Sequence, residues 1–546
     1  MESTSSDLSA GRLEGEGNGR PPDRRRWARR SGIGAGAVGL GLLLALAIGR
    51  LSQQVPLNSD QASSVLEGFA MGHGNALLRG WTLPSDSFYT SKLPLLALLE
   101  WFQGLTPQVV YEVSGLLGAL VVLAAIWLAG GRQRGLSRLV AMIFTGALLA
   151  SQALLVPSAG GSFPSGAMLP AGTDHAASLV LLLVAWLALQ RAEGSRPWLV
   201  VTWVALTAAS IGDPLATVVG GGALAVAGAL DLVAGRHGGL RWDAALIGVG
   251  VSSAVAAPLA WWSIRRLGGF TAAPLLGGGY GLPPLVSSLS HNLSMGGRAL
   301  LTVFGADFLD QSGGPAVASA LLHLCGLLVV VAVLLWLLWP PRWLGLDGVS
   351  RVLSLGMVLD AGAYIVGQQA TDLTSARYLV PFLGFGAVLA GREGVPRLLA
   401  LRPRLVLGLV AIGAAYAGVF AAGVVTAEPA APPLAGVTAY LADHGATYGL
   451  GTYWEANVVT VSTHGTIAVR SIVTGSGAVS PFLWHSTISW YAAGRDRATF
   501  VLLAATDTGD RATVEKVLGR PAETATEDGT TIMVWASNLL VHLAPP

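Results

Sequence analysis

The chain has 546 residues, of which 52% are hydrophobic and 12% charged, about half the charged share of a typical soluble domain, so the composition predicts a multi-span membrane protein. With 33 basic and 31 acidic residues the net charge is +2, and no broad basic surface indicates nucleic-acid binding. The one cysteine, Cys325, excludes an intramolecular disulfide and any cysteine-based zinc or iron–sulfur site.

Residues 1–30 are rich in Gly, Ser, Pro and Arg and predict a disordered basic tail. Five arginines end this tail just before the first apolar run: Arg24, Arg25, Arg26, Arg29 and Arg30. Because basic flanks of membrane spans stay on the cytoplasmic side, we expect a cytoplasmic N-terminus. The run could also be a cleaved signal peptide, but the lack of a small-residue cleavage site after Leu51 favours a retained anchor.

A membrane-spanning helix needs about 20 mostly apolar residues, and some charge-free runs here are shorter than that. Arginines concentrate in every second connection, which favours a crossing for every run. The predicted fold is an all-α polytopic domain over 31–426 with about eleven transmembrane helices. With the N-terminus in the cytoplasm, eleven crossings place the C-terminus outside the cell, so we expect a multi-pass plasma-membrane protein. The runs are 33–49, 109–130, 139–157, 175–190, 197–211, 214–233, 244–263, 316–339, 350–368, 377–391 and 405–426.

Three segments are predicted to lie outside: loops 52–108 and 264–315, and a C-terminal region, 427–546. The C-terminal region opens with a Pro/Ala linker, and its pattern predicts a small α/β domain. Helices are expected at 434–444 and 510–518, and strands at 448–453, 458–462, 466–469, 499–504 and 531–535. Its aromatic residues and histidines suit either sugar stacking or ordinary core packing: Trp454, His464, Trp484, His485, Trp490 and Tyr491.

Ionisable residues in the first outside loop are the first candidates for chemistry, because charge near lipid is costly. Asp60 lies near the start of a predicted interfacial helix, where it is either a functional carboxylate or the helix N-cap. Further along, Asp86 and Tyr89 precede Lys92, the one lysine of the predicted membrane domain. Lys92 suits a phosphate contact as a point charge, or extension of its ammonium toward lipid headgroups.

The order Asp60-Gln61-Ala62, then Lys92-Leu93-Pro94-Leu95, after a first span and before many others, resembles the integral-membrane GT-C glycosyltransferases. The similarity is greatest to the branch with protein O-mannosyltransferases and the lipid A aminoarabinose transferase. That branch typically has Asp-Glu-Ala and Lys-Pro-Pro-Leu, so Gln61 and Leu93 depart from it. The second acidic role of the family is thereby left open between Asp86 and Asp174.

The resemblance implies transfer of a sugar, mannose or a similar hexose, from a polyprenyl-phosphate donor on the extracytoplasmic side. By this likeness Asp60 is the catalytic carboxylate, which removes the acceptor proton or orients the acceptor for an inverting displacement. Lys92 is expected to bind the departing lipid phosphate. The acceptor is left open among a protein, a glycan, a lipid and a secreted metabolite.

Two further acidic positions face the same predicted surface. Asp174 and His175 open the fourth predicted span and suit a divalent cation such as Mg or Mn, an acceptor contact, or a plain N-cap. Asp213 lies in a Gly-Asp-Pro turn, and GT-C enzymes often have an acidic residue at the outer end of such a helix. No cofactor is certain from these residues.

A short polar connection, 368–381, contains Asp372, Arg377 and Tyr378 and resembles the Arg-Tyr-Leu-x-Pro element seen late in this superfamily. Arg377 departs from the expected arginine distribution, because it is predicted to lie outside. A guanidinium there suits bidentate contact with a donor phosphate or anchoring to headgroups.

Other functional classes remain as alternatives. A lipid-linked glycan polymerase or ligase would use arginines and a histidine of loop 264–315, namely Arg265, Arg266, His291 and Arg298. A transporter or flippase would need acids at mid-membrane depth, where Asp360 is the candidate. A non-catalytic envelope scaffold would tolerate replacement of Asp60.

Overall fold

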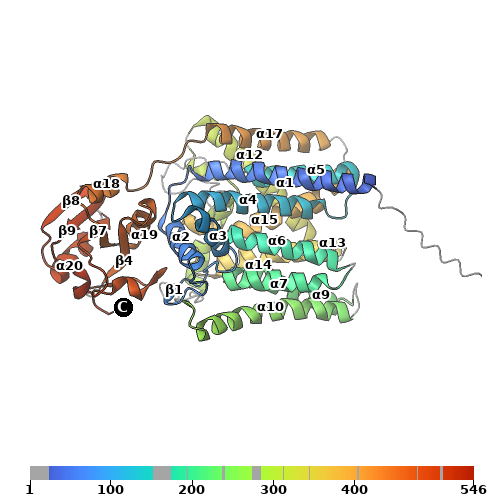
Figure 1. Ribbon diagram of the computed structural model, residues 1–546. Helices are drawn as coiled ribbons and strands as arrows, with labels where there is room; N and C mark the ends of the chain where they lie inside the picture. Colours follow the sequence, from blue (N-terminus) through green and yellow to red (C-terminus); the bar gives the residue numbers. More distant parts are fainter. Residues whose placement is uncertain are drawn as a thin grey trace, which may run out of the picture.

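The computed structural model describes residues 24–151, 174–193, 195–235, 240–272, 285–311, 313–343, 345–401, 405–475, 477–504 and 508–545. They form a bundle of long helices and a smaller α/β domain at one end of it (Figure 1). The N-terminal end of the first helix and the C-terminal domain lie at opposite ends of the bundle (Figure 1). The predicted combination of a helical membrane domain with a C-terminal α/β domain is confirmed.

Apolar helices coincide with all eleven predicted runs, although the predicted end of the third run, 152–157, lies outside the described residues. Nine helices in the described ranges are long and apolar enough to cross a membrane, and α5 and α7 are shorter. The helices of the bundle are α1 (Arg24–Ser52), α4 (Gln108–Gly130), α5 (Gly135–Ser151), α6 (Asp174–Ala192), α7 (Trp198–Gly212), α8 (Pro214–Ala216), η1 (Thr217–Gly222), α9 (Ala223–Val233), α10 (Leu240–Arg266), α12 (Gly314–Leu337), α13 (Pro340–Trp343), α14 (Gly348–Val366), η3 (Leu373–Leu379), α15 (Val380–Leu389), η4 (Ala390–Gly394), α16 (Val395–Leu401) and α17 (Leu405–Thr426).

Helix α1 begins at Arg24, inside the segment 1–30 that the sequence predicts as a disordered tail. Residues 1–23 lie outside the described part of the chain. The helix can start there because no proline or glycine interrupts the arginine-rich segment, and arginine is a good helix former.

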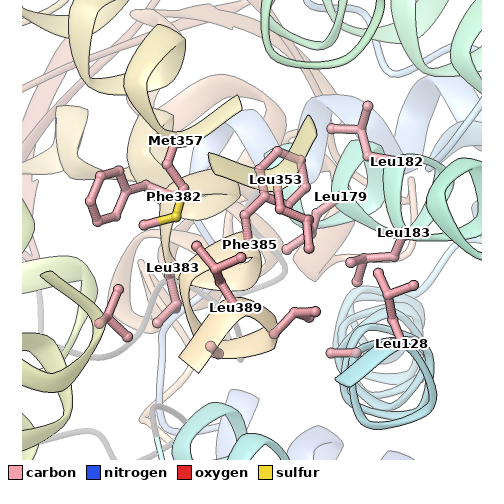
Figure 2. Close-up of a cluster of buried hydrophobic side chains, with 14 of the residues drawn as sticks. Leu128, Leu179, Leu182, Leu183, Leu353, Met357, Phe382, Leu383, Phe385 and Leu389 are labelled. Carbon is pink, nitrogen blue, oxygen red and sulfur yellow. The ribbon is translucent and has the colours of Figure 1, made fainter. Parts of the chain in front are cut away.

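Close packing inside the bundle depends on small and large apolar residues. Helix α1 lies against α4 at Gly115, where an added Cβ would come within 2.3 Å of the Ala45 carbonyl oxygen, so only glycine permits this approach. Leucine, methionine and phenylalanine side chains from α4, α6, α14 and α15 fill the middle of the bundle (Figure 2).

The longer helix α11 and several short elements lie at the end of the bundle that faces the C-terminal domain. They are α2 (Ser59–Gly72), β1 (Trp81–Leu83), α3 (Leu93–Gln103), β2 (Thr271–Ala272), α11 (Leu285–Val303) and η2 (Phe308–Asp310). Strand β1 pairs in parallel with β2 and antiparallel with β6 of the C-terminal domain. One small sheet thus joins both predicted outside loops to the C-terminal domain.

A six-stranded mixed sheet in the order β5-β4-β3-β7-β9-β8 forms the C-terminal domain. Strand β3 is parallel to β4 and β7, and the other pairs are antiparallel. The elements are α18 (Ala435–Asp443), β3 (Tyr448–Gly451), α19 (Tyr453–Ser462), β4 (Ala468–Gly475), β5 (Ala478–Pro481), β6 (Ser486–Thr487), η5 (Ile488–Tyr491), β7 (Phe500–Ala504), α20 (Thr508–Leu518), β8 (Glu523–Glu527), β9 (Thr530–Val534) and η6 (Leu539–His542).

The predicted strand at 458–462 is wrong, because these residues form the second half of α19. Val458 and Val461 pack into the apolar cluster around α2 and α3, while Val459 packs into the core of the C-terminal domain. Burial on two sides at helical spacing therefore outweighs the strand preference of the β-branched residues.

Candidate active site between the bundle and the C-terminal domain

Helix α2 determines where Asp60 lies. The N-cap of this helix is Asn58, whose side chain accepts from the Gln61 backbone N–H at 2.9 Å. The Gln61 side chain accepts in return from the Asn58 backbone N–H at 3.2 Å, which completes a capping box. The N-cap alternative for Asp60 is therefore wrong, and Asp60 lies in the first turn with its carboxylate available for other contacts.

The Asp60 carboxylate lies between residues of two distant segments. The Tyr453 hydroxyl donates to Asp60 Oδ1 at 2.6 Å, and Arg377 Nη1 lies 3.6 Å from Oδ2. The side chain of Asp60 is 28% exposed and that of Arg377 35% exposed. A carboxylate and a guanidinium are thus both reachable by a ligand at the same point.

Tyr453 is the first residue of α19 in the C-terminal domain. Burial, together with the neighbouring Asp60 carboxylate, raises the pKa of Tyr453 well above its ordinary value. The phenol therefore keeps its proton at all physiological pH values and acts as a hydrogen-bond donor to Asp60.

Lys92 is only 3% exposed and contacts Ser64, which lies one helical turn after Asp60 in α2. Its Nζ donates to Ser64 Oγ at 3.2 Å, and Ser64 Oγ donates to the Asp60 backbone carbonyl at 3.0 Å. Lys92 also immediately precedes α3. The lysine therefore links the start of α3 to α2 close to the carboxylate.

Two more contacts join α2 to the C-terminal domain. Asn457 Nδ2 donates to Ser63 Oγ at 2.8 Å, and His485 Nδ1 lies 2.6 Å from Glu67 Oε1. Burial alone would lower the pKa of His485, but the Glu67 carboxylate, assisted by Asp60 and Asp86, raises it above its ordinary value. The raised pKa of His485 favours its protonated form, in which the imidazole and the buried Glu67 side chain form an ion pair.

A second polar pair joins the start of α6 to the residue that follows α7. His175 Nδ1 lies 2.8 Å from Asp213 Oδ2, and both side chains are 2% exposed. Asp213 also accepts from the Leu215 backbone N–H at 2.9 Å and so caps α8, in agreement with the predicted turn role. The His175 ring lies 4.8 Å from the ring of Tyr378, the neighbour of Arg377.

His175, Asp213 and Tyr378 line a cavity of about 350 Å³ with mostly apolar walls. Its other lining residues come from α8, η1, the C-terminal part of α14 and the segment 367–369 that follows it. Asp360 also belongs to the lining, and its Oδ2 accepts from the Phe382 backbone N–H at 2.9 Å. Asp360 therefore satisfies a free N–H in the first turn of α15, which accounts for an acid at this depth without a transport role.

The remaining predicted site residues lie around this region. Asp86 is half-buried, and its charge acts on His485. The Tyr89 hydroxyl donates to the Ala76 carbonyl at 2.8 Å, and burial raises the pKa of this phenol. Asp372 is exposed and caps η3 by accepting from the Thr374 N–H at 2.8 Å. Asp174 is the first residue of α6, and its side chain lies outside the described part of the structure.

The candidate cation ligands do not form a donor set in the described residues. No group of three or more His, Cys, Asp or Glu side chains among them could hold a metal ion. His175 Nδ1 already contacts Asp213. Two of the four residues that carry the polymerase alternative have other partners: Arg298 pairs with Asp307 at 3.4 Å, and His291 Nε2 lies 3.0 Å from the Ala370 carbonyl.

Sequence reasoning missed Glu67, Tyr453 and Asn457 as neighbours of Asp60. Tyr453 is separated from Asp60 by 393 positions, and Asn457 from Ser63 by 394. The one available signal was Glu67, an acid within the otherwise apolar stretch that follows Asp60, where a charge needs a partner.

No protein-family profile matches the chain, and no curated protein matches it. Among solved structures, the apo crystal structure of ArnT from Cupriavidus metallidurans is similar to it, with 13% sequence identity and a TM-score of 0.38. The match covers 94% of this chain and 100% of the ArnT chain. A likeness at this level transfers no residue role.

Proposed function

We propose that this protein is a membrane glycosyltransferase that moves a sugar from a polyprenyl-phosphate donor to an acceptor hydroxyl. One observation carries the proposal: the Asp60 carboxylate and the Arg377 guanidinium lie 3.6 Å apart, both partly exposed, at the end of a bundle of membrane-length helices. The motif resemblance around Asp60 and Lys92 points to the same chemistry.

Asp60 is the proposed general base. In an inverting displacement the acceptor oxygen bonds to the anomeric carbon while the bond from that carbon to the phosphate oxygen breaks. The acceptor proton passes to Asp60 and then to water, and polyprenyl phosphate leaves. A base positioned in this way contributes roughly 10²- to 10⁴-fold in rate.

Arg377 is the first candidate for the donor phosphate. Its guanidinium is partly exposed and can make two parallel hydrogen bonds to phosphate oxygens, which stabilises the charge that develops on the leaving group. Lys92 is the second candidate, and the phosphate would have to draw its ammonium away from Ser64. No step of this mechanism requires a metal ion.

The cavity beside Tyr378 suits the lipid part of the donor. Its walls are mostly apolar, and Tyr378 adjoins Arg377, so an isoprenoid chain could enter the cavity while its phosphate meets the guanidinium. This arrangement favours a lipid-linked donor over a nucleotide sugar. Mannose or a similar hexose is the proposed sugar, and the acceptor class is open among a protein, a glycan, a lipid and a secreted metabolite.

The decisive experiment measures transfer of radiolabelled hexose from polyprenyl-phosphate hexose to membrane acceptors. It compares wild type with Asp60→Asn, Arg377→Ala and a control, Asp443→Asn, which removes an exposed carboxylate at the end of α18. We expect Asp60→Asn to lower transfer at least about 10²-fold with the donor still bound. The control should match wild type, whereas full activity of Asp60→Asn, or no transfer by wild type, would exclude the proposed function.

A further inference from the structure

The contacts of the C-terminal domain with α2 lie on one face of this helix. The domain reaches four α2 residues separated by helical spacing, Ser59, Asp60, Ser63 and Glu67. The contacts at Ser59, Ser63 and Glu67 hold the C-terminal domain against α2. None of these three residues takes part in the proposed reaction. The fourth reaches the proposed base itself.

Tyr453 is held firmly enough to orient another side chain. Its backbone carbonyl accepts from the Ser59 hydroxyl, and its ring lies 5.7 Å from Phe482 in an edge-on arrangement. The ring also stacks at 6.4 Å on His485, which is itself paired with Glu67. The phenol therefore has little freedom to leave Asp60 while the domain is docked.

We propose that Tyr453 is a positioning residue for Asp60, so that the C-terminal domain completes the active site of the membrane domain. This inference rests on the proposed function. The phenol fixes Oδ1 at 2.6 Å while Arg377 faces Oδ2, which holds the carboxylate in one orientation toward the acceptor. Without the phenol, the carboxylate can rotate toward Arg377 alone.

The other charged groups near Asp60 are Arg377 from η3, Lys92 through Ser64, and the Glu67–His485 pair. Loss of the Tyr453 donor leaves all of these in place. A change in kcat on loss of this donor would therefore report on the orientation of the Asp60 carboxylate, because the neighbouring charges are unchanged.

The test uses the full chain with Tyr453→Phe, which removes the hydroxyl and keeps the ring. Tyr440→Phe is the matched control, because Tyr440 donates to the Glu523 carboxylate at 2.5 Å in the same domain. Asn457→Ala weakens docking without removing the phenol contact. The readouts are kcat, the donor KM, and hydrogen exchange of α2 and α19 as a measure of docking.

We expect Tyr453→Phe to lower kcat about tenfold or more with an unchanged donor KM, while hydrogen exchange of α2 and α19 stays as in wild type. Tyr440→Phe should change neither quantity. A wild-type kcat in Tyr453→Phe, or a loss of kcat accompanied by the same faster exchange as in Asn457→Ala, would overturn the inference while an inactive Asp60→Asn keeps the proposed function. No transfer by wild type would overturn both.

Discussion

Glu67 and His485 are separated by 418 positions in the chain, yet His485 Nδ1 lies 2.6 Å from Glu67 Oε1. The Glu67 side chain is fully buried, so its charge depends on this one partner from the C-terminal domain. His485 directly precedes β6, which pairs with β1. A titratable pair thus lies where the domain is attached to the membrane helices.

Docking of the C-terminal domain should weaken at alkaline pH. Because the folded-state pKa of His485 is raised, the pair contributes fully below about pH 6.5, the ordinary value for histidine, and is lost as pH rises through the raised value. Hydrogen exchange of α2 and α19, corrected for intrinsic rates, should therefore accelerate as the pH rises above about 6.5 and through the raised pKa of His485. His485→Gln should exchange faster at pH 6 and vary little with pH, and an identical pH response in this variant and wild type would contradict the assignment.

Replacement of Gln61 by glutamate should be tolerated. Gln61 occupies the third helical position of the capping box, where either Gln or Glu can accept from the Asn58 N–H. Asn58→Ala should instead lower the free energy of unfolding by ~1 kcal/mol, through loss of the cap. Thermal unfolding and transfer activity in detergent measure both effects, and a Gln61→Glu variant as unstable as Asn58→Ala would refute the structural role.

The packing of α2 on α3 should depend on Gly68. An added Cβ there would lie 2.7 Å from Leu96 Cβ and 2.7 Å from the buried Glu100 side chain. Gly68→Ala should therefore destabilise the protein by ~1–3 kcal/mol, because α2 must move away from α3 and carry Asp60 with it. The control is Gly297→Ala in α11, where nothing lies within 4 Å and stability should stay constant or rise in thermal unfolding. Equal stability of the two variants would contradict this prediction.

Two substitutions of Arg377 should distinguish the contribution of its positive charge from that of its planar guanidinium group. Arg377→Lys keeps a cation near Asp60 but loses the planar guanidinium, so kcat/KM for the lipid donor should fall about tenfold or more. Arg377→Ala should fall further, because no cation remains to meet the leaving phosphate. Steady-state kinetics with varied donor concentration measure the effect, and wild-type kcat/KM in Arg377→Lys would show that no bidentate contact is made.

The membrane helices could be predicted because each crossing depends on its own residues. A segment of about 20 apolar residues satisfies its backbone groups within its own helix, whatever the rest of the chain does. Helix α2 was predictable in the same way, from the apolar spacing after Asp60. The local sequence pattern also predicted most elements of the C-terminal domain. It failed at 458–462, where burial of the segment on two sides stabilises helix α19 instead of a strand.

The surroundings of Asp60 depended on the tertiary structure. Its motif and its place after the first span marked it as a candidate in the sequence, as an unusual arginine position did for Arg377. No local signal connected Asp60 with Tyr453, 393 positions away, or Glu67 with His485. Such contacts arise when whole elements pack, here α19 on α2 and β6 on β1, and the free energy that selects this packing is distributed over many distant residues.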